Sequence, residues 1–311
     1  MEDKVFKLLK DNDAAKVCSI LNISLYELFT IVDKLKTKQV YLYPKINSQG
    51  NLFFNEKKLI GDEDTKLTVK DDKYVFLVIS DIHIGSKYDD VNRLEIIKNF
   101  ALNNEINLIL NCGDLIDGPV HEDQSMPKRI ESLDDQINEF MEKYPLEHGL
   151  NTICVLGDHD LKYKTENNDS INKSIKKYRP DIRVYSSGCG IININGKEIL
   201  ICHNSSDNRI KQRLLDDMYM FAGHSHMYLN KTYYNGIDYS LRIVAPSISN
   251  LPLYNHVMPG FLKVSMYFND YDLTKINIDN YNFSINNEIL FNGSINYNLN
   301  VNNNMSRKRN K

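Results

Sequence analysis

Aspartate and histidine residues are concentrated in five short motifs, each of which follows an apolar stretch of the chain. In chain order the motifs are Asp81-Ile82-His83, Gly113-Asp114-Leu115-Ile116-Asp117, Gly157-Asp158-His159-Asp160, His203-Asn204 and Gly223-His224-Ser225-His226. Carboxylate oxygens and imidazole nitrogens bind divalent transition metals. The motifs supply too many such ligands for one tetrahedral site, and enough for two metal ions that share a bridging carboxylate.

The ligand types indicate the metal and the reaction. Nitrogen and oxygen ligands without thiolates favour Mn²⁺, Fe or Zn²⁺ over Ca²⁺, and we take Mn²⁺ as the first candidate. Two such ions about 3.5–4 Å apart clamp a phosphoryl group and generate a hydroxide near neutral pH. The motifs therefore predict two divalent metal ions as cofactors and phosphoester hydrolysis as the reaction.

The apolar stretches before the motifs predict the strands that position them. Runs at 74–79, 106–110 and 152–156 are continuously apolar, which is typical of strands buried on both faces. Helical patterns at 91–100 and around 128–143 lie between these runs, so the region predicts an α/β layered core. Loops at the carboxyl ends of strands in such a sheet converge on one crevice, which would bring the motifs together.

Spacing within the motifs predicts how pairs of ligands converge. In an extended turn, residues i and i+2 point the same way. Asp81 and His83 can therefore chelate a metal ion, and so can His224 and His226. A glycine at the start of three of the motifs lets the backbone turn sharply off its strand.

The region after the third motif is rich in predicted strands, which fall at 182–185, 191–194, 198–202, 218–222, 228–234 and 240–244. A second sheet, mixed or antiparallel and packed on the first, is the economical interpretation. Beyond about 275 the sequence is rich in Asn and Ile and ends in Arg307-Lys308-Arg309-Asn310-Lys311. This end predicts a short strand pair followed by a basic tail.

Residues 1–60 are predicted to form a small module of their own. Apolar patterns indicate two short helices and a third that opens at Ser24, with Glu27 at the capping-box spacing. Two extended stretches at 40–46 and 52–54 follow. Three helices and a two-stranded wing resemble a winged helix-turn-helix, which would place the third helix in a DNA groove. A protein-contact or packing module is the alternative, and both interpretations stay open.

The composition of the chain excludes some classes of protein. The chain has 311 residues, of which 42% are apolar and 25% charged, so global disorder is excluded. A net charge of −3 excludes a global positive field, so any DNA contact needs a local patch. The five scattered cysteines favour reduced thiols, and no apolar run approaches the ~20 residues that span a bilayer. We expect a cytoplasmic protein without a signal peptide or membrane contact, and the oligomeric state stays open.

These observations predict four segments along the chain. They are the N-terminal module at 1–60, a polar linker at 61–73, a catalytic domain at 74–275 and C-terminal strands with the basic tail at 276–311.

The five motifs resemble the signature of the calcineurin-like metallophosphoesterase superfamily, which reads DxH, GDxxD, GNH(D/E), H and GHxH. The resemblance covers roughly 74–250 and implies a four-layer α/β/β/α sandwich of two mixed sheets. It implies that one metal ion is held by Asp81, His83, Asp114 and His226. It also implies that Asp114 bridges to a second ion held by Asp158, His203 and His224.

The same resemblance implies a part for His159 that is not metal binding. This histidine would stabilise the transferring phosphoryl group or protonate the leaving group, with Asp160 orienting it. The family has Asn where this chain has Asp158. The added carboxylate lets us expect that both metals still bind, with equal or higher affinity, but that they are weaker Lewis acids and that an anionic phosphate is repelled somewhat.

Other polar residues near the motifs are weighed against ordinary structural roles. For Asp117 we favour a helix cap or the support of a ligand over metal binding. His121 and Asn204 are candidate substrate contacts, although simple solvent exposure is the ordinary interpretation of His121. His148 is interpreted as a helix-end residue and His256 as part of a surface loop.

We therefore expect a metal-dependent phosphoester hydrolase, and a phosphodiesterase or nuclease rather than a phosphomonoesterase. The stretch Ser80-Asp81-Ile82-His83-Ile84-Gly85-Ser86 is similar to a motif of the exonuclease small subunit of archaeal D-family DNA polymerases, so DNA is one candidate substrate. Two alternatives stay open. One is a DNA- or protein-binding regulator with a weak or inactive phosphoesterase scaffold, and the other is a phosphatase that acts on a small nucleotide.

Overall fold

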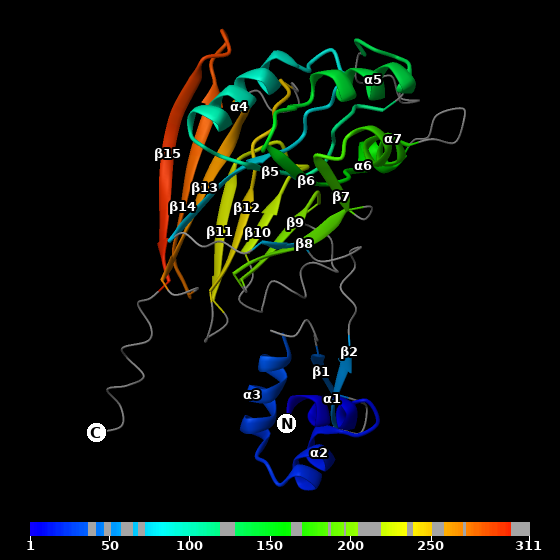
Figure 1. Ribbon diagram of the computed structural model, residues 1–311, viewed down its shortest axis with the longest axis vertical. Helices are drawn as coiled ribbons and strands as arrows, with labels where there is room; N and C mark the ends of the chain where they lie inside the picture. The colour runs from blue at the N-terminus through cyan, green and yellow to red at the C-terminus, as the bar shows by residue number, and fades with distance from the viewer. Residues whose placement is uncertain are drawn as a thin grey trace. The chain divides into compact units, whose positions relative to one another are not determined.

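The chain divides into two compact units, Met1–Ile60 and Gly61–Lys311. The computed structural model describes residues 1–36, 42–46, 51–56, 65–67, 72–118, 128–162, 170–185, 188–195, 197–204, 219–234, 239–250, 258–269 and 272–299. Figure 1 shows the helices and strands of both units. Each unit is described by itself below.

The N-terminal unit contains three helices and a hairpin, which are α1 (Glu2–Leu9), α2 (Ala14–Leu21), α3 (Leu25–Lys36), β1 (Leu42–Ile46) and β2 (Leu52–Glu56). The predicted capping box is present, because the Glu27 N–H donates to Ser24 Oγ and the Ser24 N–H donates to the Glu27 carboxylate. The β strands pair antiparallel. That this unit is a winged helix stays a prediction.

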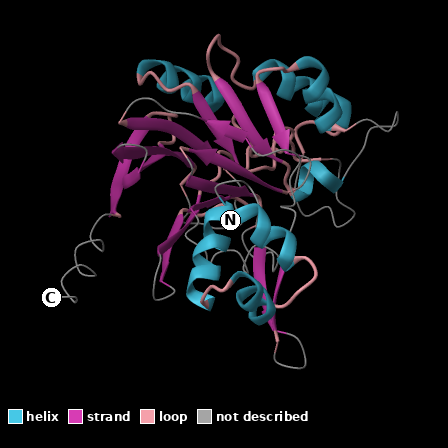
Figure 2. Ribbon diagram, turned by 60° about the horizontal axis from the view of Figure 1, so that its bottom comes forward, coloured by secondary structure: helices cyan, strands magenta, loops and turns pink. Residues whose placement is uncertain are grey.

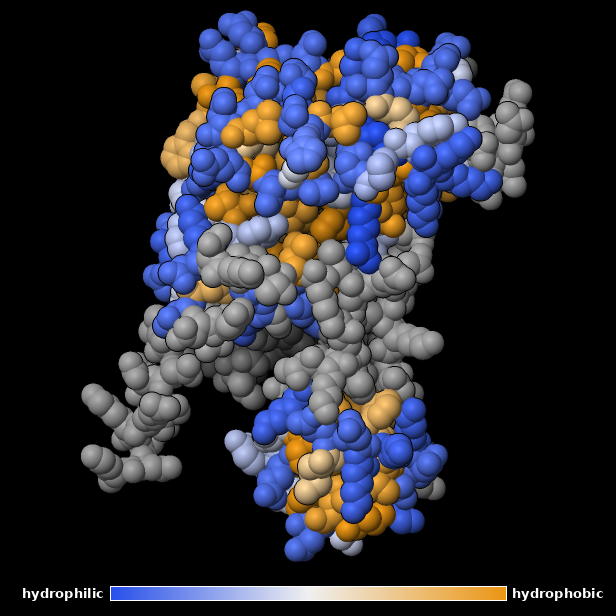
Figure 3. Space-filling model, in the orientation of Figure 1, coloured by the Kyte–Doolittle hydropathy of each residue, from blue (hydrophilic) through white to orange (hydrophobic). Residues whose placement is uncertain are grey.

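Apolar side chains lie on both faces of α3. Leu28, Val32 and Leu35 are buried in the core of the N-terminal unit, whereas Tyr26 is 82% exposed and Phe29 is 40% exposed. Apolar residues accordingly reach the surface of this unit in Figure 3. Among the described residues no single helix is long and apolar enough to cross a membrane, although α2 and the first part of α3 pass that test as a bent pair.

A seven-stranded sheet carries the first three motifs. Its strand order is β15 (Ile289–Asn298), β14 (Asp272–Phe283), β13 (Gly260–Asn269), β4 (Lys73–Ile79), β5 (Leu108–Asn111), β6 (Asn151–Val155) and β7 (Ile182–Tyr185). The strands from β4 to β7 are parallel, and β13, β14 and β15 extend the sheet with antiparallel pairing. The parallel half is the part in which strand ends share one edge.

A six-stranded mixed sheet carries the other two motifs. Its strand order is β11 (Leu229–Tyr234), β12 (Tyr239–Val244), β10 (Tyr219–Ala222), β9 (Lys197–Cys202), β8 (Cys189–Ile194) and β3 (Thr65–Leu67). The strand β10 runs parallel to both β9 and β12. The carboxyl ends of β9 and β10 therefore lie side by side.

Alternation along β4 divides its side chains between two cores. Phe76 and Val78 face the core between the sheets, where Ile201 from β9 also lies. Leu77 and Ile79 face the opposite side, where they pack with helices. These helices are α4 (Asn92–Asn103), α5 (Leu133–Lys143) and α7 (Ile171–Tyr178). Figure 2 shows the helices over one face of the seven-stranded sheet.

The α/β fold of two mixed sheets with helices is the predicted one. Within the described part of the chain α4, α5 and α7 pack on the seven-stranded sheet, and the second predicted helical layer is not found there. Two predicted boundaries differ from the structure. The segment at 61–73 contains β3, which pairs with β8 as part of a sheet. The boundary at 275 falls inside β14, because the expected short strand pair is two strands of twelve and ten residues that continue the sheet from β13.

Candidate metal centre

The five motifs meet at one edge of the two sheets. They follow β4, β5, β6, β9 and β10, and backbone hydrogen bonds tie their loops together. The Asp81 N–H donates to the Gly113 carbonyl at 2.9 Å, and the Gly223 N–H donates to the His203 carbonyl at 3.0 Å. Between the sheets, the His224 N–H donates to the Asp81 carboxylate at 3.0 Å. The aspartates and histidines of distant segments are thereby held in one small volume.

Left-handed backbone aims the side chains of this edge. Five of the predicted ligands have positive φ, namely Asp81 (55°), His83 (51°), Asp114 (54°), His224 (70°) and His226 (59°). The expectation that paired ligands share an extended turn is therefore wrong, because these loops turn too tightly for extended geometry. Such a conformation costs a non-glycine residue about 1–3 kcal/mol, and it concentrates at functional sites.

One group of candidate ligands contains Asp81, His83 and His226, with ligand atoms within 4.8 Å of one another. The Asp81 Oδ1 atom lies 3.9 Å from His83 Nε2 and 3.6 Å from His226 Nε2. Asp81 and His83 are buried, and the His226 side chain is 12% exposed. These residues come from both sheets, since Asp81 follows β4 and His226 follows β10.

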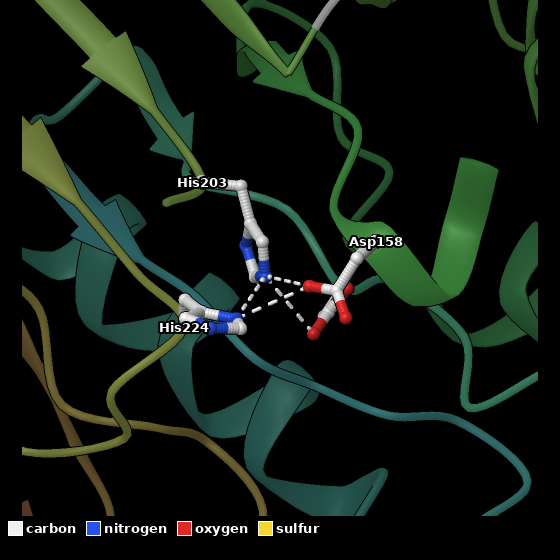
Figure 4. Close-up of side chains that lie close together, drawn as sticks. Asp158, His203 and His224 are labelled. Carbon is white, nitrogen blue, oxygen red and sulfur yellow. Dashed lines mark hydrogen bonds and ion pairs between the residues drawn. The ribbon is translucent and has the colours of Figure 1, made fainter. Parts of the chain in front are cut away.

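The second group contains Asp114, Asp158, His203 and His224, again within 4.8 Å. His203 Nε2 lies 3.1 Å from Asp114 Oδ2 and 2.9 Å from Asp158 Oδ1. His224 Nδ1 lies 3.1 Å from the same Asp158 oxygen. Figure 4 shows one Asp158 oxygen directed at both rings. Together the two groups contain the seven residues that the resemblance implies as ligands, with Asp114 in the second group and with His224 and His226 in different groups.

Unsatisfied nitrogens test whether metal ions fit these groups. Among the described residues, His83 Nε2 and His226 Nδ1 are buried ring atoms without a hydrogen-bond partner. Buried polar atoms are almost always hydrogen-bonded, so each needs an explanation. A metal ion would satisfy His83 Nε2, which faces Asp114 Oδ2 at 3.5 Å and Asp81 Oδ1 at 3.9 Å. The donor set therefore fits divalent ions with mixed nitrogen and oxygen ligands.

The carboxylates shift the pKa values of the imidazoles. Burial disfavours a charged His203, but the charge of Asp114 and hydrogen bonds with Asp114 and Asp158 outweigh it and raise the pKa of His203 well above its usual value. The hydrogen bond with Asp158 raises the pKa of His224. Conversely, hydrogen bonds with His203 and His224 lower the pKa of Asp158. Because imidazole binds a metal ion only when it is deprotonated, metal ions would compete with protons for these nitrogens.

A third group, His83 with Asp117 and His159, is a hydrogen-bonded network. Asp117 Oδ1 lies 3.1 Å from His83 Nδ1, and the Asp117 carbonyl lies 2.8 Å from His159 Nδ1. The Lys128 ammonium forms an ion pair with the Asp117 carboxylate. Because Lys128 already supplies a positive charge to Asp117, we assign this group to ligand support. Asp117 thus supports a candidate ligand, as expected.

Asp160 does not orient His159 as we predicted. It is buried, and its carboxylate accepts hydrogen bonds from the N–H groups of Leu115, Ile116 and Gly157. Burial and the charge of Asp114 raise the pKa of Asp160 to about 7. Asp160 therefore joins the loop after β5 to the loop after β6, and the part predicted for it falls to Asp117.

The structure gives no support for substrate contact by Asn204, and it does not describe His121. Asn204 is exposed at the end of the described segment after β9, and His121 lies outside the described residues, as does His256. His159 is 23% exposed at the side chain, and its ring centroid lies 4.7 Å from that of His83. His159 therefore lies against the candidate ligand His83, as Asp117 does.

Comparison with known proteins agrees with this geometry. A family model described as calcineurin-like phosphoesterase matches residues 74–250. The chain belongs to this family. Its site therefore has the family's phosphoesterase character, and the family uses divalent metals. No curated protein matches the chain.

Several solved structures of low identity are similar to the chain. Vps29 from Entamoeba histolytica, complexed with zinc, is 17% identical with a TM-score of 0.42, and the match covers 72% of this chain and 99% of that one. Vacuolar protein sorting 29 from Cryptosporidium parvum is 15% identical with a TM-score of 0.42, covering 73% and 100%. An archaeal phosphodiesterase is 14% identical with a TM-score of 0.40, covering 70% and 98%.

Sequence reasoning missed several residues that support the phosphoesterase site. The Ser247 hydroxyl donates to the Asp81 carbonyl at 2.9 Å, and the Ser249 N–H donates to the same oxygen at 3.2 Å. Lys128 holds Asp117 from a position eleven residues further along the chain. These residues lie outside the five motifs, and a single sequence gives no spacing signal for them.

Replacing Lys128 by methionine is expected to weaken both stability and activity. The Lys128 and Asp117 side chains are each 3% exposed, so the substitution leaves a buried carboxylate without its cation. Such a loss costs about 3 kcal/mol of unfolding free energy, and disturbed support of a ligand costs about 10–100-fold in activity. Urea unfolding and steady-state kinetics measure the two effects.

Lys98→Met is the matched control. Lys98 pairs with Glu95 at 2.7 Å on the surface of α4, where the Glu95 side chain is 61% exposed. An exposed pair contributes at most about 1 kcal/mol, so this variant should unfold and turn over almost like the wild type. Equal effects of the two substitutions would show that Lys128 has no special part in the site.

Proposed function

We propose that this chain is a phosphodiesterase that works with two divalent metal ions, Mn²⁺ being the first candidate. One observation carries the proposal, namely the position of a single oxygen, Asp114 Oδ2. It lies 3.1 Å from His203 Nε2 of one ligand group and 3.5 Å from His83 Nε2 of the other. A carboxylate placed between two groups of ligands is suited to bridge two metal ions.

The ligand groups and His159 have different parts in the proposed reaction. When bound, the two ions polarise a phosphoryl oxygen and lower the pKa of a water molecule. His159 contributes proton transfer, because its Nδ1 atom is 2.8 Å from the Asp117 carbonyl and must carry a hydrogen to donate there. Protons can then enter or leave the ring only at Nε2. This geometry suits a general acid that protonates the leaving oxygen.

Exposure indicates how a substrate reaches the site. The Asp158 side chain is 60% exposed and that of His224 is 44% exposed, whereas Asp81, His83 and His203 are buried. The cluster is therefore open on the side of Asp158 and His224. An open edge leaves room for organic groups on both sides of a phosphodiester, and a DNA strand is one such substrate.

A substrate panel tests the proposal. The full chain is loaded with Mn²⁺ and incubated with bis-p-nitrophenyl phosphate, p-nitrophenyl phosphate, cyclic nucleotides, and single- and double-stranded DNA. We expect diester cleavage to exceed monoester cleavage. Turnover of monoesters alone would favour the small-nucleotide phosphatase, and no turnover with two bound ions would favour the regulator with an inactive scaffold.

A further inference from the structure

The net charge of the ligand cluster affects which class of phosphate ester binds there. We propose that Asp158 makes the site selective for singly charged phosphodiesters over doubly charged phosphomonoesters. The inference rests on the proposed metal-dependent function, and it concerns the one ligand carboxylate that faces solvent.

The position of Asp158 distinguishes it from the other two carboxylates. Asp81 and Asp114 have side chains that are at most 2% exposed, whereas that of Asp158 is 60% exposed. Its Oδ1 atom contacts His203 and His224 at 2.9 and 3.1 Å, and Figure 4 shows the other oxygen turned away from these rings. Asp158 therefore lies within the cluster and at its open edge, where an incoming phosphate arrives.

The net charge of the cluster with two bound ions determines how well each class of phosphate ester is neutralised. Each ligand group contains two carboxylates, if Asp114 is counted in both, and two imidazoles. Two divalent ions would bring four positive charges, and the three carboxylates cancel three of them. While a water molecule at the ions keeps both protons, one positive charge is left, which a diester with a single negative charge neutralises. A monoester brings two negative charges near neutral pH, so its second charge gains nothing from the cluster.

An amide at this position would leave two positive charges instead. The dianion would then gain roughly the interaction of two further pairs of charges and the monoanion that of one, so the two differ by one pair. At a partly exposed site this difference amounts to about tenfold in relative affinity. Asp158 thus acts on the ratio between the two substrate classes more than on binding itself.

The experiment measures binding as well as turnover. The full chain and Asp158→Asn are saturated with Mn²⁺, their metal content is determined, and affinities for inorganic phosphate and dimethyl phosphate are measured by calorimetry at about pH 8, where phosphate is mainly a dianion. We expect Asp158→Asn to raise the affinity for phosphate relative to dimethyl phosphate by about tenfold. The rate ratio of p-nitrophenyl phosphate to bis-p-nitrophenyl phosphate should rise in parallel.

Three variants complete the design. Asp158→Glu keeps the charge and should keep the wild-type ratio. Asp134→Asn removes an exposed carboxylate on α5, outside the ligand groups, and should also leave the ratio unchanged. Asp158→His supplies a neutral ligand, and replaces the Asn variant in the measurement if the latter holds only one ion.

Two outcomes separate this inference from the proposed function. An unchanged ratio of phosphate to dimethyl phosphate binding, with both ions present, would overturn the inference on Asp158. A changed ratio in a protein that hydrolyses neither substrate would support the inference and overturn the proposed phosphodiesterase.

Discussion

Asp114→Asn is expected to remove at least one of the two metal ions and to lower kcat/KM by about three orders of magnitude or more. Asp114 Oδ2 faces ligand nitrogens of both groups, so loss of its charge lowers the affinity for both ions at once. Burial disfavours the charged carboxylate, but the neighbouring imidazoles lower its pKa to about 2, so Asp114 is ionised throughout the neutral range. Metal ions supply several kcal/mol of transition-state stabilisation, which corresponds to this loss of rate.

Metal content and rate are measured together for this variant. Asparagine keeps an oxygen that can accept a hydrogen bond from the backbone N–H of His159, as Asp114 Oδ1 does at 3.0 Å, so the fold should persist. Circular dichroism and thermal unfolding check this point, and Asp134→Asn serves as the control for a lost carboxylate. A variant that keeps two ions and the wild-type rate would show that Asp114 does not bridge.

The ligand groups could be anticipated because the chemistry of each residue is local. A strand that is buried on both faces is read from an apolar run such as 74–79, and a polar residue directly after it must lie at the edge of the sheet. The side chains of Asp81 and His83 are placed by this logic alone. The conformation that aims them is not, because the left-handed φ values of 55° and 51° depend on loops from another strand.

Supporting residues were harder to anticipate because their contacts join segments that are distant in the sequence. Asp160 sits beside His159 in the chain, yet its carboxylate holds backbone N–H groups of the loop after β5. Lys128 reaches Asp117 from a segment without a motif. The strand β13 lies between β4 and β14 in the sheet, an order that apolar periodicity cannot specify.

His159→Ala is expected to lower kcat by about 10²–10⁴-fold while both metal ions stay bound. His159 lies outside the two ligand groups, and its contact to the Asp117 carbonyl fixes the nitrogen that exchanges protons. The effect should depend on the leaving group. A general acid matters most when the departing oxygen is strongly basic, so a dinucleotide should suffer the full loss and bis-p-nitrophenyl phosphate a much smaller one.

The dependence on the leaving group decides between the two parts considered for His159. If the ring stabilises the charge of the phosphoryl group, both diesters should slow by the same factor, because that charge is common to them. If the ring donates a proton, the two factors diverge. His148→Ala is the matched control, since His148 is exposed after α5 and outside the ligand groups. Wild-type rates on both diesters in His159→Ala would exclude both parts and leave catalysis to the metal ions and their ligands.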